Sequence, residues 1–284
     1  HEGDNPTRIH QRLTELVKFH NLPHNCYCFI SGNTAAKNID NFVYFPDFEL
    51  WYMHRNSEAA LQIHTIPRER DFTVLNRLHK SWRATAMADL HRHNLLNNSY
   101  WSYCETGTII DEDNPIQIDA FNNLRADTKT FLDAAPYISD ELTMDERNDH
   151  SITESKYFVN AYCNIVMETH FDADGSGGTF LTEKTYKPIK HGQLFFVAGP
   201  PGSLQLLRDQ GYRTFDDILD NRYDDAVSST ARWDLLCSAI AQARPQLPEL
   251  FERARVDIEH NQQLFQANKS QRLNSLIKDI NEHC

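Results

Sequence analysis

Hydroxyl, acidic and basic side chains are grouped between residues 168 and 188, in the sequence ETHFDADGSGGTFLTEKTYKP. Thr182 is a typical helix-capping residue, and Glu183, Lys184 and Lys187 follow it where a helix would begin. Backbone N–H groups at a helix N-terminus attract anions, and two lysines beside them add positive charge. We therefore expect Lys184 and Lys187 to bind a diphosphate and Glu183 to accept hydrogen bonds from sugar hydroxyls. An ordinary capped, solvated helix start would account for the same residues.

A second group of candidate phosphate ligands lies in the sequence FTVLNRLHKSWRATAMADL, residues 72–90. Its apolar start predicts a strand, and its alanine-rich end predicts a helix. Asn76 ends the strand, Arg77 follows in a polar loop, and Arg83 stands near the start of the helix. Both arginines are candidate phosphate ligands because a guanidinium matches phosphate geometry, although Arg77 fits a surface position equally well.

Alternating strands and helices position these two loops. The pattern predicts strands at residues 25–31, 42–53 (broken at Pro46), 72–76, 100–103, 157–167 and 193–198. It predicts helices at 8–19, 82–93, 182–190, 203–209 with Ser203 as cap, and from 248 onward. This alternation favours a mostly parallel sheet. Ligands of such sheets bind beyond the carboxyl ends of the strands, where both loops would lie.

The segment Thr182-Glu183-Lys184, preceded by a strand and Glu168, resembles the donor-binding signature of the α-1,3-fucosyltransferase family and its viral and bacteriophage relatives. In that family Glu-Asn-Ser follows the strand, and Tyr-x-Thr-Glu-Lys opens the helix. Here the matching stretches are Glu168-Thr169-His170 and the five residues starting at Phe180. The layout around Arg83 is also similar, since an Arg of the family opens a helix and pairs with the donor diphosphate. The resemblance covers roughly residues 68–225.

The resemblance implies a GT-B-like α/β fold, with two Rossmann-like halves, mostly parallel sheets and a small N-terminal half. We expect a small acceptor-side region at residues 1–70 and a donor-binding domain at 71–245. Residues 111–149 interrupt the resemblance like an acidic insertion, and residues 246–284 form C-terminal helices.

The function implied is a glycosyltransferase, hexosyl- or fucosyltransferase-like, that moves a sugar from a nucleotide diphosphate sugar to a glycan or another hydroxyl compound. If it follows the family, the reaction inverts the anomeric centre and needs no metal. Arg83 and Lys184 would be catalytic, because they would neutralise the leaving diphosphate. The expected substrate-binding residues are Asn76, Arg77, Glu168, Phe180, Thr182, Glu183 and Lys187. For the general base, the nearest carboxylates are Asp47 and Glu49.

The sequence departs from the family in three ways. The region before Phe72 is much shorter than the acceptor domain of the family, so the resemblance does not place the catalytic carboxylate. Phe180 replaces a Tyr whose hydroxyl contacts the donor, and Thr169-His170 replaces Asn-Ser. The sugar or base recognised can therefore differ. A calcium-binding or degenerate transferase fold that serves as an interaction module without catalysis is the alternative function.

A sequence motif typical of calcium-binding loops overlaps the residues of the candidate donor-binding loop. Asp172, Asp174, Ser176, Gly177 and Glu183 match positions 1, 3, 5, 6 and 12 of an EF-hand. Against this, the preceding segment predicts a strand rather than a helix. The two aspartates also resemble the metal-binding pair of manganese-dependent glycosyltransferases, which have another fold. We therefore expect no metal cofactor, with Ca²⁺ as the alternative.

The amino-acid composition limits the classes of partner that we expect for this protein. The 284 residues carry a net charge of −12. Residues 111–149 contribute −8 of it, with eleven acidic against three basic residues. This balance disfavours a broad nucleic-acid surface, so a transferase acting on modified DNA bases would need a basic groove that the sequence does not offer.

No apolar run is long enough for a membrane span, so we expect no membrane partner. The six cysteines include no CxxC pair, and we expect a cytoplasmic protein, in the host cytoplasm if it is viral.

Overall fold

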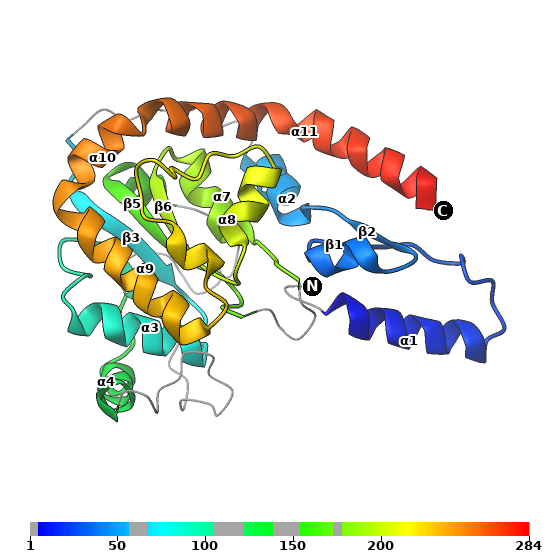
Figure 1. The fold of residues 1–284 in the computed structure, drawn as a ribbon, viewed down its shortest axis with the longest axis horizontal. Coiled ribbons are helices and arrows are strands. Elements are labelled where there is room, and N and C mark those ends of the chain that lie inside the picture. Colours follow the sequence, from blue (N-terminus) through cyan, green and yellow to red (C-terminus); the bar gives the residue numbers. More distant parts are fainter. Residues whose placement is uncertain (1–4, 57–66, 105–121, 139–153, 173–177, 284) are drawn as a thin grey trace.

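A four-stranded parallel sheet forms the centre of the fold. The computed structural model describes residues 5–56, 67–104, 122–138, 154–172 and 178–283. The strands β3 (Arg70–Asn76), β4 (Tyr100–Tyr103), β5 (Ala161–Met167) and β6 (Leu194–Ala198) lie in the order β4-β3-β5-β6, and every neighbouring pair is parallel. Figure 1 labels β3, β5 and β6 of this sheet. The chain is therefore α/β with mostly parallel sheets, as the sequence predicted, and this arrangement is compatible with a Rossmann-like fold.

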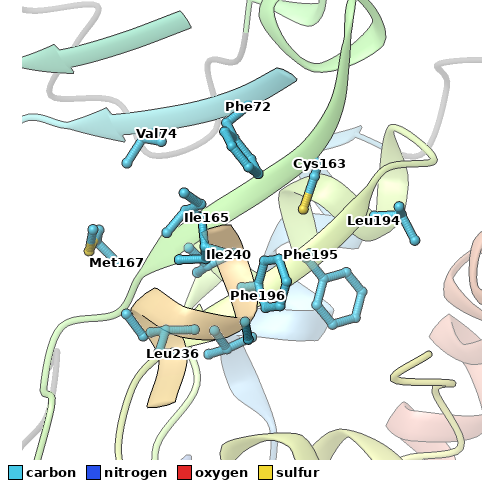
Figure 2. Close-up of a cluster of buried hydrophobic side chains, with 14 of the residues drawn as sticks. Phe72, Val74, Cys163, Ile165, Met167, Leu194, Phe195, Phe196, Leu236 and Ile240 are labelled. Carbon is cyan, nitrogen blue, oxygen red and sulfur yellow. The ribbon is translucent and has the colours of Figure 1, made fainter. Parts of the chain in front are cut away.

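The two inner strands explain why this sheet forms the core. Every residue of β5 is buried, as is every residue of β6. Continuous apolar strands of this kind are typical of parallel sheets covered on both faces. Figure 2 shows Phe72, Ile165 and Phe196 of the strands together with Leu236 of a covering helix.

Helices connect and cover the strands. They are α3 (Ser81–Arg92), α4 (Asn122–Asp133), α6 (Ser155–Val159), α7 (Glu183–Lys190), α8 (Ser203–Asp209), α9 (Ser229–Ala243), α10 (Leu247–Arg253) and α11 (Arg255–His283), with short 3-10 turns at Arg222–Asp225 and Arg244–Gln246. Figure 1 shows α11 running across the top of the molecule. It contacts α7 and α2, which joins the C-terminal end of the chain to the N-terminal part.

The N-terminal part has a small sheet of its own. Helix α1 (Pro6–Phe19) precedes β1 (Phe29–Ser31), the 3-10 helix η1 (Thr34–Asn38), β2 (Phe42–Tyr44) and α2 (Asp47–Asn56). Strands β1 and β2 pair in parallel and are separate from the central sheet. The division into domains at residues 70 and 245 stays a prediction. Of the acidic insertion, residues 122–138 are described, and they contain α4.

Several predicted elements were wrong in extent or type. The strand expected at 42–53 ends at Tyr44, and α2 follows, because Pro46 interrupts the strand and Asp47 and Glu49 favour the first turn of a helix. The strand expected at 25–31 is shorter, and the one expected at 157–167 begins at Ala161 after α6. Helix α9 was not predicted.

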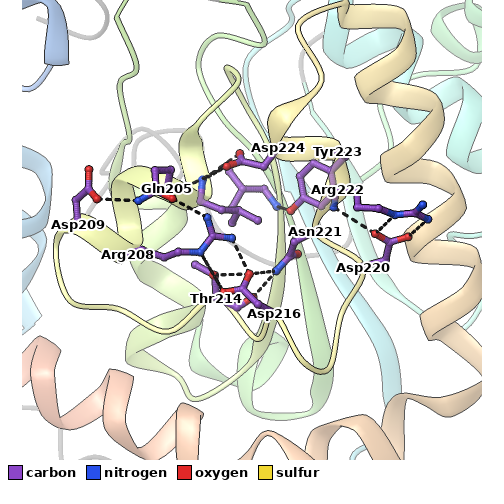
Figure 3. Close-up of polar contacts among 12 residues, drawn as sticks. Gln205, Arg208, Asp209, Thr214, Asp216, Asp220, Asn221, Arg222, Tyr223 and Asp224 are labelled. Atoms are coloured by element: carbon purple, nitrogen blue, oxygen red, sulfur yellow. Dashed lines mark hydrogen bonds and ion pairs between the residues drawn. The ribbon is translucent and has the colours of Figure 1, made fainter.

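The predicted cap of α8 was also wrong. Gly202, with a φ of 78°, is the N-cap, and the Ser203 hydroxyl donates to the Pro200 carbonyl. The Asp224 carboxylate accepts hydrogen bonds from the backbone N–H groups of Leu204 and Gln205 (Figure 3). The start of α8 is therefore already occupied by an acidic side chain of the protein.

Candidate functional site

The strand order creates one switch point in the central sheet. From β3 the chain passes through α3 to β4 on one side, and the later strand β5 pairs with β3 on the other side. In sheets of this type, the crevice at the carboxyl ends of the two strands flanking the switch is the usual ligand site. Here β3 ends at Asn76 and β5 ends at Met167, directly before the two loops selected from the sequence.

Arg83 joins these two loops. Its guanidinium is buried, and Nε and Nη2 donate to the backbone carbonyl of Glu168 at 3.1 and 2.6 Å. This contact fixes the start of α3 against the end of β5.

Glu168 fixes the start of α7 to the same strand end. Its fully buried carboxylate accepts four hydrogen bonds, and each oxygen binds one backbone N–H and one hydroxyl. The Thr182 N–H (3.0 Å) and the Thr185 hydroxyl (2.5 Å) donate to Oε1. The Thr169 N–H (3.1 Å) and the Thr182 hydroxyl (2.8 Å) donate to Oε2. Glu168 therefore positions the helix start, and its expected contact with substrate stays a prediction.

Thr182, Glu183 and Lys184 form the helix start as predicted. Thr182 is the N-cap of α7 and accepts from the Lys184 N–H at 3.4 Å. The Lys184 ammonium lies 3.0 Å from Oε1 of the buried Glu183 and 3.2 Å from the Thr182 hydroxyl. The Lys184 side chain is 24% exposed, so solvent or a ligand can reach it. Lys187 lies one turn further along α7 and is half-buried.

Three buried polar atoms at this edge of the sheet lack a hydrogen-bond partner among the residues that the structure describes. They are the Nδ2 of Asn76, the Nε1 of Trp82 and the hydroxyl of Thr169. Each side chain is at least nine-tenths buried. Trp82 stacks on Phe171 at 5.1 Å, which places it against the loop after β5. The two nitrogens can only donate and a hydroxyl can also donate, so an oxygen-rich ligand is the partner that fits all three.

Asp47 approaches this region from the N-terminal part. The Asp47 carboxylate and the Phe180 ring both lie close to Gly32. A methyl group added at Gly32 would be 2.4 Å from Asp47 Oδ1 and 2.9 Å from the Phe180 ring. Phe180 also contacts Phe48 edge-on at 5.4 Å. Burial raises the pKa of Asp47, and its Oδ1 has no hydrogen-bond donor within the described ranges.

Glu49, the other candidate base, is bound inside the protein. Its fully buried carboxylate pairs with Arg272 of α11 at 2.8 Å and accepts from the Tyr212 hydroxyl at 2.5 Å. The two acids therefore have different roles: Glu49 ties α2 to α11, and Asp47 faces Phe180.

Arg77 lies half-buried in the loop directly after β3, where the sequence placed it. Sequence reasoning missed Trp82, although it stands next to Arg83, and it singled out Thr169 only as a departure from the family signature. Their positions were visible in the sequence, but their lack of partners depends on tertiary packing.

Most of the predicted calcium loop lies outside the described residues, because Asp174, Ser176 and Gly177 are not among them. Asp172 pairs with Arg232 at 2.9 Å and contacts the Ser229 hydroxyl. In the part of the chain that the structure covers, no three His, Cys, Asp or Glu residues are grouped to hold a metal ion. No helix among those residues is long and apolar enough to cross a bilayer.

No protein-family model, curated protein or solved structure matches this chain.

Proposed function

We propose that this protein is a GT-B-type glycosyltransferase that binds a nucleotide diphosphate sugar at the carboxyl ends of β3 and β5. The observation that carries the proposal is the set of buried polar atoms of Asn76, Trp82 and Thr169 at the switch point of the sheet, which have no hydrogen-bond partner among the described residues. Leaving a buried donor unsatisfied costs about 1–3 kcal/mol, so such a site favours a ligand rich in acceptor oxygens. A diphosphate supplies these oxygens.

Two cations flank that position. Arg83 holds a buried positive charge at the start of α3, and Lys184 holds a half-exposed one at the start of α7. In the proposed reaction, both stabilise the negative charge that develops on the leaving diphosphate. Glu183, beside Lys184, accepts hydrogen bonds from donor hydroxyls. The Glu168 carboxylate acts indirectly, because its four hydrogen bonds hold Thr182 and therefore Lys184 in place.

Asp47 is the proposed general base. An acceptor hydroxyl loses its proton to the Asp47 carboxylate while its oxygen bonds to the anomeric carbon of the donor. The bond from that carbon to the diphosphate breaks, and the nucleoside diphosphate leaves with the electron pair. A partly buried carboxylate with a raised pKa suits this role, because a base works best when its pKa approaches the working pH.

Nucleotide binding to Lys184 variants tests the donor site. The change Lys184→Ala removes one charged hydrogen-bond donor, so calorimetry should show UDP or GDP binding weakened by about 1.5–3 kcal/mol. Lys278→Ala, a change at an exposed lysine of α11, is the matched control and should bind as the wild type does. Equal nucleotide affinity in all three proteins would overturn the donor site.

A thermal-shift scan separates this function from the alternative. Stabilisation by GDP or UDP supports a transferase, whereas stabilisation by Ca²⁺ alone supports a calcium-stabilised interaction module. A panel of nucleotide sugars with product detection then identifies the donor.

A further inference from the structure

A second cavity lies between α3 and α9, away from the proposed donor site. Its volume is about 530 Å³, within the range of small-molecule sites. Asp89, Arg92 and Leu95 line it from the last turn of α3 and the residues that follow, and Trp233, Asp234 and Cys237 line it from α9. Arg83 lies in the first turn of the same helix, six residues before Asp89, which is about 9 Å along the helix axis.

A buried carboxylate forms one wall of this cavity. The Asp89 side chain is 9% exposed. Its Oδ1 accepts from Arg92 at 2.6 Å, and its Oδ2 accepts from the Trp233 indole N–H at 2.9 Å. The Cys237 thiol lies 3.8 Å from Oδ2, and His93 lies 3.5 Å from Oδ1. Arg92 therefore compensates the charge of Asp89.

A second carboxylate, that of Asp234, lines the cavity without compensation. Within the described parts of the chain, no cation and no hydrogen-bond donor contacts it. Partial burial and the negative charge of Asp89 raise the pKa of Asp234. Asp89, Asp234 and Arg92 together leave one negative charge facing the cavity. The C-terminal end of α3 adds the negative end of a helix dipole.

Trp233 and Leu95 give the cavity an apolar wall, and the Trp233 part of it is fixed in place. The Trp233 ring is held by its hydrogen bond to Asp89 and packs edge-on against Phe171 at 6.1 Å. Arg232, its neighbour, donates to the backbone carbonyls of Ala226 and Phe171. A wall that is ordered before binding reduces the entropy cost of holding a ligand.

We propose that this cavity binds a small organic amine, with its ammonium group at Asp234 and Asp89 and its apolar body against Trp233 and Leu95. An acidic ligand would meet two carboxylates, and a neutral one would leave the charge of Asp234 uncompensated. The chemistry therefore selects a primary ammonium on a short aromatic or aliphatic body.

The indole N–H signal of Trp233 in a ¹H–¹⁵N NMR spectrum reports on this cavity, and it can be assigned with Trp233→Phe. Phenethylamine should shift the signal saturably, and 2-phenylethanol, of nearly the same shape but uncharged, should bind at least about fivefold more weakly. Asp234→Asn should weaken phenethylamine binding by about the same factor and leave 2-phenylethanol unchanged. Asp234 is exposed, so this variant should fold.

The matched control is Asp217→Asn, a change at another exposed aspartate that does not line the cavity. This variant should bind phenethylamine as the wild type does. The proposal is overturned if the Trp233 signal does not shift, if the amine and the alcohol bind equally, or if Asp234→Asn retains the full affinity for the amine.

Discussion

The buried Glu168 carboxylate offers the sharpest test of how the site is assembled. The change Glu168→Gln keeps the size and shape of the side chain but replaces one acceptor oxygen with an NH₂ donor. Each oxygen of Glu168 accepts one backbone N–H and one hydroxyl. A hydroxyl can turn to accept from the new NH₂ group, but a backbone N–H cannot. One backbone N–H, that of Thr169 or Thr182, is therefore left buried and facing a donor.

The expected loss follows from these contacts. An unsatisfied buried N–H costs about 1–3 kcal/mol, and exchanging charged for neutral acceptors weakens the remaining bonds by about 1 kcal/mol. We expect Glu168→Gln to lower the free energy of unfolding by about 2–4 kcal/mol. Urea unfolding followed by tryptophan fluorescence measures it. Glu249→Gln, at an exposed residue of α10, is the control and should change stability by less than about 0.5 kcal/mol.

If Glu168→Gln stays within the range of the control, the reasoning is refuted. Such a result would mean that the four hydrogen bonds contribute nothing net, and that the start of α7 is held by packing alone. If stability falls as expected, nucleotide binding should fall too under conditions where the variant is folded, because Lys184 depends on the position of Thr182.

Three further changes test the base, the contact between α2 and α11, and the loop before α7. The raised pKa of Asp47 means that its ionised form destabilises the fold, so Asp47→Asn should unfold at an equal or higher urea concentration at pH 7. This gain in stability should shrink as the pH falls below the pKa of Asp47. Nucleotide binding should persist in the variant, and sugar transfer should stop. Arg272→Met leaves the buried charge of Glu49 without its ion pair and should lower the free energy of unfolding in urea by about 3–5 kcal/mol. The added change Glu49→Gln should restore most of this loss. Gly178→Ala would place a methyl 1.8 Å from Asn33 Oδ1 and should cost about 1–3 kcal/mol by the same measurement; unchanged stability would show that η1 can move.

The central sheet could be predicted because its strands carry strong local signals. The apolar runs at β3, β5 and β6 contain enough β-branched and aromatic residues to specify buried strands without any knowledge of their partners. The aromatic-rich stretch after Phe42 gave the same signal, yet it contains a short strand and then α2. There Pro46 and the acids after it decided the outcome, because helix starts favour acidic residues.

The site could be predicted only in part. The sequence indicated which two loops would meet, because both follow strands of one parallel sheet. It could not separate Asp47 from Glu49. Asp47 and Glu49 are two residues apart on a helix, so their side chains point about 200° apart around its axis. One of them can therefore face Phe180 while the other faces α11. Which one does so depends on how α2 is packed, and that is a tertiary contact. The same holds for Glu168, whose carboxylate is occupied by residues up to 17 positions away.

Helix α3 connects the two proposed sites, so the proposed anion and cation would bind near opposite ends of one helix. Its N-terminal end holds Arg83 at the donor site, and its C-terminal end holds Asp89 beside the second cavity. The helix dipole favours negative ligands at the first end and positive ligands at the second. Arg83 and Asp89 lie six residues apart, about 9 Å along the helix axis, which is close to the distance over which salt at physiological strength screens exposed charges. Arg92 pairs with Asp89 at 2.6 Å and lies 3.3 Å from Asp127 of α4, so its guanidinium offsets part of the negative charge that these acids place near Arg83.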